Sequence, residues 1–422
     1  MRVVKAVKQC YRPSPETLVL LEDFRLMVND CIRIALKMWA EGDAITSMRR
    51  LCLASYHTLT QYPIATCYRL TAISKAAGIL KTYRKALRKN PAARRPYARK
   101  LMLTDCYGFR IQGKKLRLTL GPHEYNYVEL NPHTLAAIQG HAARSITLTE
   151  TMLSISYSKE IDEMQPSGVL GVDRNLDNAT AAYSDDGSTR RFDLSEVTQI
   201  KQTYRFVKSR FARNDARVRA AIYAKYGKLQ RDRVGWILHN TSSSIVKDAG
   251  ERRLAIVMED LRGIRKLYRR GNGQGNNYRS RLNSWSYYEL QRQIGYKARW
   301  KGTPVLYVTA GGTSAKCSMC GSKTFPNEDH TLFCPRCKKT VDRDVNAARN
   351  ILAKGVLRFG TNGPRDEAME AEREHEQETL IRTVDGGKSV IKNDKRVRTL
   401  NSSRLAFGHS SSEEYFTIEK TS

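Results

Sequence analysis

The chain has 422 residues, 41% of them apolar, so it is long enough to build two or three domains with cores of their own. Its 73 Lys and Arg exceed its 42 Asp and Glu, and the formal net charge of +31 favours a polyanionic partner, nucleic acid ahead of an anionic membrane. No apolar run approaches the ~20 residues of a membrane-spanning helix, and the first residues lack the apolar core of a signal peptide. We therefore expect a cytoplasmic protein without a membrane partner.

A helical block interrupts strand-like segments within the first 165 residues. Ser14 suits a helix N-cap and Pro15 suits the first helical position, and apolar residues then recur at helical spacing. Residues 107–130 and 145–161 alternate apolar and polar side chains, as strands do. We therefore expect a small β-barrel or sheet domain, with the helical block inserted into it.

Lys and Arg cluster in three stretches that contain few acids. Residues 81–100 continue the helical pattern with nine Lys or Arg and no acid, which favours a phosphate-binding surface over a solvated helix face. Residues 201–233 carry 11 Lys or Arg against two Asp, and residues 262–281 add seven more basic residues. The candidate nucleic-acid-binding residues are Arg84, Lys85, Arg88, Arg94, Arg95, Arg205, Arg210, Arg213, Arg269 and Arg270.

From Gly168 onward the predicted elements follow the order of a mixed sheet flanked by helices. That order resembles the ribonuclease H-like fold. The elements are three strands with a turn at 185–187, two helices at about 196–250, an apolar strand at 254–261, a helix at about 280–300, a strand at 303–310, a cysteine-rich insert, and a last helix that begins near Asp344.

Three acidic residues stand on these elements where divalent metal ions could bind. Asp173 lies within an apolar strand, Glu259 lies at the carboxyl end of another, and Asp344 opens the last helix. Ligands of open sheets gather at the carboxyl ends of strands, so Asp173 and Glu259 can face each other if their strands are neighbours. Such carboxylates can hold two Mg2+ ions, or Mn2+ in their place, for phosphodiester hydrolysis. Asp260 remains an alternative to Glu259, and Asp342 to Asp344, which could instead cap its helix.

Four of the nine cysteines form two Cys-x-x-Cys pairs separated by 13 residues. Four thiolates can close a tetrahedral zinc site with no open position, so this spacing predicts a structural zinc that folds a segment too short for a core. A pair of disulfides is the alternative, which an intracellular location disfavours. His330 is interpreted as a loop residue rather than a ligand. The predicted zinc ligands are Cys317, Cys320, Cys334 and Cys337.

The motifs GVDRN, MEDL, the four-cysteine module and DRDVNAARNI occur in this order along the chain. In these motifs the chain resembles the split RuvC domain of TnpB proteins and of their descendants, the type V CRISPR effectors. The resemblance is strongest from about residue 168 to 355. It implies a catalytic triad of Asp173, Glu259 and Asp344 with bound Mg2+, preceded by a helical recognition lobe and a β-barrel wedge domain. One departure is Asn175, where many relatives carry Gly.

The expected fold is therefore multidomain α+β: a ribonuclease H-like (RuvC) nuclease domain with an inserted four-cysteine zinc ribbon, preceded by a helical lobe inserted into a β-barrel wedge domain. The expected boundaries are 1–12 and 101–165 for the wedge domain, 13–100 for the helical lobe, 166–312 and 340–360 for the nuclease, 313–339 for the zinc ribbon and 361–422 for a disordered tail, which is acidic at first and then rich in Ser, Lys and Asn.

The resemblance implies an RNA-guided DNA endonuclease that takes its guide RNA from a transposon end. Its target would be double-stranded DNA with a short adjacent motif, because in such enzymes the guide reads the sequence by pairing. A compact type V CRISPR effector is the near alternative. A protein-directed transposase or resolvase would need a sequence-reading element that the chain lacks, and an RNA-guided repressor that does not cleave is disfavoured by the three acids.

Overall fold

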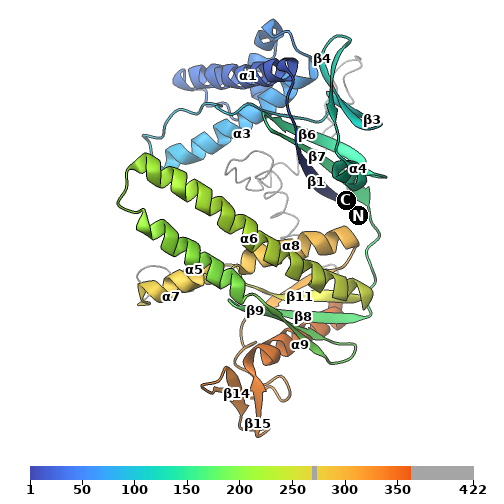
Figure 1. Ribbon diagram of the computed structural model, residues 1–422, viewed down its shortest axis with the longest axis vertical. Coiled ribbons are helices and arrows are strands. Elements are labelled where there is room, and N and C mark those ends of the chain that lie inside the picture. The colour runs from blue at the N-terminus through green and yellow to red at the C-terminus, as the bar shows by residue number, and fades with distance from the viewer. Residues whose placement is uncertain (269–272, 363–422) are drawn as a thin grey trace. The chain divides into compact units, whose positions relative to one another are not determined.

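The computed structural model describes residues 1–268 and 273–362 (Figure 1), and the chain divides into two compact units. Residues 2–160 form the first unit, and Met1 with the described residues from 161 onward forms the second. The predicted tail lies outside the described residues, except for residues 361 and 362, which end a helix. Within the described ranges, no helix is both long and apolar enough to span a bilayer.

Helices fill the early part of the first unit. Ser14 accepts a hydrogen bond from the backbone N–H of Thr17 (3.3 Å) and Pro15 begins the first helix, so the predicted helix start is confirmed. The helical pattern that was expected to continue to about Lys100 ends at Lys89, because Pro91 disfavours a helical backbone at Asn90. The helices are α1 (Pro15–Ala40), α2 (Met48–Ser55) and α3 (Cys67–Lys89), with a short 3-10 helix, η1 (His57–Gln61).

Two antiparallel sheets complete the first unit. One has the order β1-β7-β6-β2 and the other the order β3-β4-β5. Within the described residues the two sheets are not hydrogen-bonded to each other, which fits the sheet-domain alternative, and the β-barrel stays a prediction. The elements are β1 (Arg2–Cys10), β2 (Met102–Asp105), β3 (Phe109–Gln112), β4 (Lys115–Gly121), β5 (Glu124–Glu129), α4 (Pro132–Ile138), β6 (Ala142–Thr149) and β7 (Met152–Glu160).

A five-stranded mixed sheet is the centre of the second unit, with the order β10-β9-β8-β11-β12. β8 runs parallel to β11, which runs parallel to β12, whereas β9 and β10 are antiparallel to their neighbours. The predicted sequence of strands is confirmed. These strands are β8 (Gly168–Arg174), β9 (Asn178–Tyr183), β10 (Thr189–Asp193), β11 (Leu254–Asp260) and β12 (Val305–Thr309).

Several helices cover one face of this sheet and a single long helix covers the other (Figure 1). The sequence predicted one helix at about 280–300, but the structure has two helices there, separated at Trp285. The helices are α5 (Ser195–Arg210), α6 (Ala216–Glu251), α7 (Asn276–Ser284), α8 (Tyr287–Lys301) and α9 (Arg343–Asn362), with a 3-10 helix, η2 (Ile264–Tyr268).

Among the described helices, α9 is the one that packs on the face formed by Val169, Ala255 and Val257, where Ile351 contributes to a small apolar core. Its close approach depends on glycine: a Cβ at Gly171 would lie 2.5 Å from the backbone N of Leu352. The sheet therefore tolerates no side chain at this position while α9 is seated.

The cysteine-rich insert forms a three-stranded antiparallel sheet between β12 and α9. Its strands are β13 (Phe325–Pro326), β14 (Thr331–Cys334) and β15 (Lys339–Asp342). Strand β15 ends where α9 begins, so the insert leads directly into the helix that carries Asp344.

Candidate functional site

Asp173 and Glu259 stand level with each other on neighbouring strands. The register of β8 and β11 pairs Val172 with Met258, so the next residues, Asp173 and Glu259, lie side by side at the carboxyl ends. In register, they point to the same face of the sheet, the one that α9 covers. The sequence required these two strands to be neighbours if Asp173 and Glu259 were to face each other, and β8 and β11 are neighbours in the sheet.

The structure decides between Glu259 and Asp260. Asp260 follows Glu259 along the strand and so points to the opposite face. There its carboxylate pairs with the Arg262 guanidinium (2.6 Å), which lowers the pKa of Asp260. Glu259 is therefore the acid that shares a face with Asp173.

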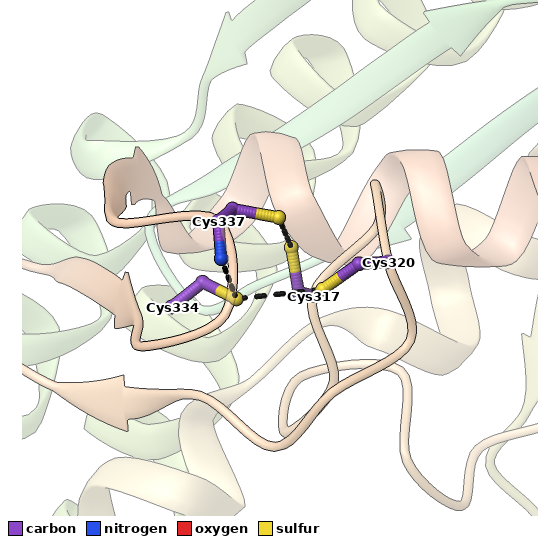
Figure 2. Close-up of side chains that lie close together, drawn as sticks. All are labelled: Cys317, Cys320, Cys334 and Cys337. Atoms are coloured by element: carbon purple, nitrogen blue, oxygen red, sulfur yellow. Dashed lines mark hydrogen bonds between the residues drawn. The ribbon is translucent and has the colours of Figure 1, made fainter.

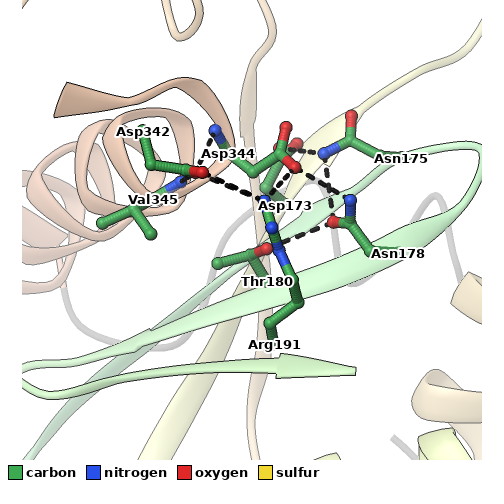
Figure 3. A network of polar contacts seen from close by, with 8 residues as sticks. All are labelled: Asp173, Asn175, Asn178, Thr180, Arg191, Asp342, Asp344 and Val345. Carbon is green, nitrogen blue, oxygen red and sulfur yellow. Dashed lines mark hydrogen bonds and ion pairs between the residues drawn. The ribbon is translucent and has the colours of Figure 1, made fainter. Parts of the chain in front are cut away.

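The structure also separates the roles of Asp342 and Asp344. A carboxylate oxygen of Asp342 accepts hydrogen bonds from the backbone N–H groups of Asp344 (2.9 Å) and Val345 (2.9 Å), which caps the first turn of α9. The Asp344 carboxylate instead turns toward β9, where it accepts a hydrogen bond from the side-chain amide of Asn178 (2.8 Å) (Figure 3). Because Asp342 does the capping, Asp344 is available as a ligand.

Two asparagines connect Asp173 with Asp344. The Asn175 amide donates to Asp173 Oδ2 (2.8 Å) and lies 3.4 Å from Asn178 Oδ1, while the Asn178 amide donates to Asp344 (Figure 3). On β10, Arg191 forms an ion pair with the same oxygen of Asp344 (2.5 Å). These groups fix the direction in which both carboxylates point.

The electrostatics of the cluster favour a cation. Burial, the charge of Glu259 and the charge of Asp344 together raise the pKa of Asp173 to about 7, and burial has the largest effect. The hydrogen bond from Asn175 opposes this shift. Three carboxylates that repel one another and have hard oxygen donors suit divalent ions such as Mg2+.

The ligand atoms of the three acids are spread more widely than those of the four cysteines. Within the described part of the chain, the only group of His, Cys, Asp or Glu whose ligand atoms all lie within 4.8 Å of one another is the set of four cysteines. The ligand atoms of Asp173, Glu259 and Asp344 therefore do not all lie within that distance of one another. A pair of ions ~3.5–4 Å apart can share such carboxylates.

The four cysteines form a compact group (Figure 2). Cys317 Sγ lies 3.9 Å from Cys337 Sγ, and Cys320 Sγ lies 3.5 Å from Cys334 Sγ. A tetrahedral zinc with ~2.3 Å bonds requires sulfur separations of about 3.8 Å, whereas a disulfide requires about 2.05 Å. The geometry fits a structural zinc, and the disulfide alternative is wrong. His330 is exposed and lies outside the cluster.

The predicted basic residues that the structure describes are all exposed. On α3 and the segment after it these are Arg84, Lys85, Arg88, Arg94 and Arg95, and on α5 and the turn after it they are Arg205, Arg210 and Arg213. None of these eight forms an ion pair with an acid of the described chain, which leaves their charges available to a polyanion. Arg269 and Arg270 lie outside the described residues.

Comparison with known proteins gives a consistent result. The family described as "Cas12f1-like, TNB domain" matches residues 287–351, from the start of α8 into α9. The TnpB-like protein MJ0751 of Methanocaldococcus jannaschii is 27% identical over 260 residues, which cover 58% of this chain and 92% of that protein. The chain is therefore similar to TnpB-like proteins and to Cas12f.

Two further matches are informative. The Escherichia coli protein InsQ, whose name contains the words "RNA-guided DNA endonuclease", is 33% identical over 130 residues, 28% of this chain and 31% of that protein. The solved structure of a Cas12f1–sgRNA–target DNA complex matches with a TM-score of 0.54 at 15% identity, and covers 80% of this chain and 83% of that one. This structural match supports a shared fold.

Some residues that contact the three acids were not predicted from the sequence. Asn178 and Arg191 bind Asp344 from β9 and β10, and the Trp285 indole donates to the backbone carbonyl of Asn175 (2.9 Å). Arg174, which is only 2% exposed, donates to the backbone carbonyl of Glu259 (2.5 Å) from the other face of the sheet. A prediction of the β8–β9 hairpin register would have found Asn178, but the others depend on contacts distant in sequence.

Proposed function

We propose that this protein is an RNA-guided DNA endonuclease of the TnpB type, with one RuvC-like centre. The observation that carries the proposal is the convergence of Asp173, Glu259 and Asp344 at the carboxyl ends of β8 and β11 and the start of α9. The strand order of the second unit supports a ribonuclease H-like nuclease, and the first unit would combine a helical recognition lobe with a wedge domain.

The carboxylates of Asp173, Glu259 and Asp344 would hold two Mg2+ ions, which supply an activated water and neutralise the leaving oxygen. The chain's own residues prepare this centre. Asn175 and Asn178 hold two of the carboxylates in a fixed direction, and the burial of Asp173 strengthens the effect of nearby charges on its carboxylate. The zinc module has no open ligand position, so its role would be structural.

Sequence recognition would be divided between protein and RNA. The exposed basic residues of α3 and α5 would neutralise phosphates without reading bases. A guide RNA from a transposon end would select the target by pairing, next to a short motif in double-stranded DNA. The Cas12f likeness keeps a compact type V CRISPR effector as a second candidate, which differs in the source of the guide.

The first test is to express the protein together with its native flanking DNA and to sequence any RNA that co-purifies. One abundant species that ends in a variable segment is expected, and its locus separates a transposon end from a CRISPR array. Protein that is free of RNA yet nicks DNA with Mg2+ would contradict RNA guidance.

The second test targets the centre. Asp173→Ala should abolish cleavage by the RNA complex, because a carboxylate ligand is lost, while target binding measured by gel shift remains. Cleavage at the wild-type rate would refute the assignment of this centre.

A further inference from the structure

Thr313 lies four residues before the first zinc-ligating cysteine and is only 3% exposed. Its hydroxyl donates a hydrogen bond to Oε1 of Glu259. The backbone carbonyl of Ala310 lies within reach of the same hydroxyl (2.8 Å). A hydroxyl has one proton, and a carboxylate is the stronger acceptor, so the bond to Glu259 is favoured.

The segment around Thr313 is held by two asparagines of α9 spaced four residues apart. The Asn350 amide donates to the backbone carbonyls of Thr313 (2.8 Å) and Lys316 (2.7 Å). Asn346, which is 1% exposed, donates to Lys316 (2.8 Å) and accepts from the backbone N–H of Ser318 (2.8 Å). Four hydrogen bonds therefore fix the backbone from Thr313 to Ser318 on α9.

Cys317 lies within this fixed segment, so the zinc knuckle and Thr313 share one short stretch of backbone. The knuckle is closed locally by hydrogen bonds from Cys317 N to Ser322 O (2.8 Å) and from Gly321 N to Cys317 O (2.9 Å). A displacement of the knuckle would move the Thr313 hydroxyl away from Glu259, because only three residues separate Thr313 from Cys317.

We infer that Thr313 is a positioning residue through which the zinc module fixes the carboxylate of Glu259. The inference rests on the proposed function in that Glu259 is taken as a metal ligand. It assigns the zinc module a second role: besides leading into α9 and Asp344, it orients the acid of β11. Outer-shell partners of metal ligands commonly change metal affinity or activity by about 10–100-fold when removed.

The experiment compares Thr313→Val, which keeps the shape and loses the hydroxyl, with Thr313→Ser, which keeps the hydroxyl. Thr324→Val is the matched control, because Thr324 is buried in the same module and its hydroxyl contacts Ala315 O (3.2 Å) and no acid. Mn2+ binding to the full-length, zinc-loaded protein is measured by electron paramagnetic resonance, and zinc content by mass spectrometry. Mn2+ is chosen because it does not compete for thiolates.

Thr313→Val should weaken Mn2+ binding by about 10–100-fold, with zinc content unchanged, whereas Thr313→Ser and Thr324→Val should bind as wild type. Wild-type Mn2+ affinity in Thr313→Val would overturn the inference. Asn350→Ala, which removes a hydrogen bond to the Thr313 carbonyl, should also weaken Mn2+ binding. An unchanged affinity would contradict the proposal that the zinc module positions Glu259 through the Thr313 backbone.

A variant of a zinc ligand tests whether the zinc module acts on Glu259 through Thr313. Cys320→Ser should weaken Mn2+ binding, and adding Thr313→Val should cause little further loss, because both changes act on one contact. If the double variant instead lost Mn2+ affinity by the product of the two single losses, the zinc module and Thr313 would act independently and the inference would be overturned. If Thr313→Val weakens Mn2+ binding but the wild-type protein cleaves no RNA-matched DNA, the positioning role stands and the proposed function fails.

Discussion

Gly171 sets how closely α9 approaches the sheet, and its replacement by alanine tests whether that distance matters. A Cβ at Gly171 would lie 2.5 Å from Leu352 N and 2.6 Å from Ala348 O, both backbone atoms of α9 that cannot rotate away. An ordinary contact begins at 3.4 Å, so α9 would have to move by about 0.9 Å, the difference between 3.4 and 2.5 Å.

This displacement has two measurable effects. Overpacking costs about 1–3 kcal/mol, and we expect the upper end because the obstructing atoms are backbone. At about 2–4 °C per kcal/mol for a domain of this size, Gly171→Ala should lower the Tm by about 6–12 °C. Asp344 opens α9 and would move by a similar distance, and a misplacement of about 1 Å can reduce a catalytic rate about 100-fold.

The assay is thermal unfolding of the full-length, zinc-loaded protein, followed by single-turnover cleavage by the RNA complex. Gly235→Ala is the matched control, since a Cβ at Gly235 in α6 meets no atom within 4 Å. Alanine in that helix interior should stabilise the protein by about 0.5–1 kcal/mol. If Gly171→Ala melted and cleaved as wild type, α9 would not be held by this contact and our account of Asp344 would be wrong.

Three further predictions concern single residues. Asp342→Ala should lower the stability of the second unit by about 0.5–2 kcal/mol, through loss of the α9 cap, and a Tm equal to wild type would contradict that role. Because the pKa of Asp173 is raised to about 7, ionisation of this carboxyl destabilises the folded state as pH rises from about 4 toward 7. Asp173→Asn should therefore melt above wild type at pH 8 in chelator but not near pH 4, and the same Tm difference at both pH values would refute this. Arg88→Ala should make the slope of log affinity for nucleic acid against log salt concentration shallower, by about the contribution of one phosphate contact. An unchanged slope in a binding titration would exclude Arg88 from contact with a phosphate.

The parts of the centre that sequence could predict are those that depend on local pattern. Asp173 and Glu259 follow from apolar strands that end in acids, and the four cysteines follow from their spacing. The choice of Glu259 over Asp260 needed the β8–β11 register, and the choice of Asp344 over Asp342 needed the hydrogen bonds at the start of α9.

Contacts that join distant segments could not be predicted from one sequence. Thr313 and Glu259 are 54 residues apart, and Arg191 and Asp344 are 153 residues apart. The sequence around each of these four residues gives no indication of which distant residue it contacts. The order of strands in the two sheets of the first unit could not be predicted for the same reason, because alternation predicts strands but not which edges pair.

The position of α9 also affects how the protein is synthesised. The apolar face formed by Val169, Ala255 and Val257 stays uncovered until residues 343–362 have left the ribosome. A nascent chain that stops within the cysteine module therefore has two of the three acids and an exposed sheet face that favours aggregation. The same dependence makes the junction before Arg343 a natural place to split the protein into two inactive pieces whose association would rebuild the centre.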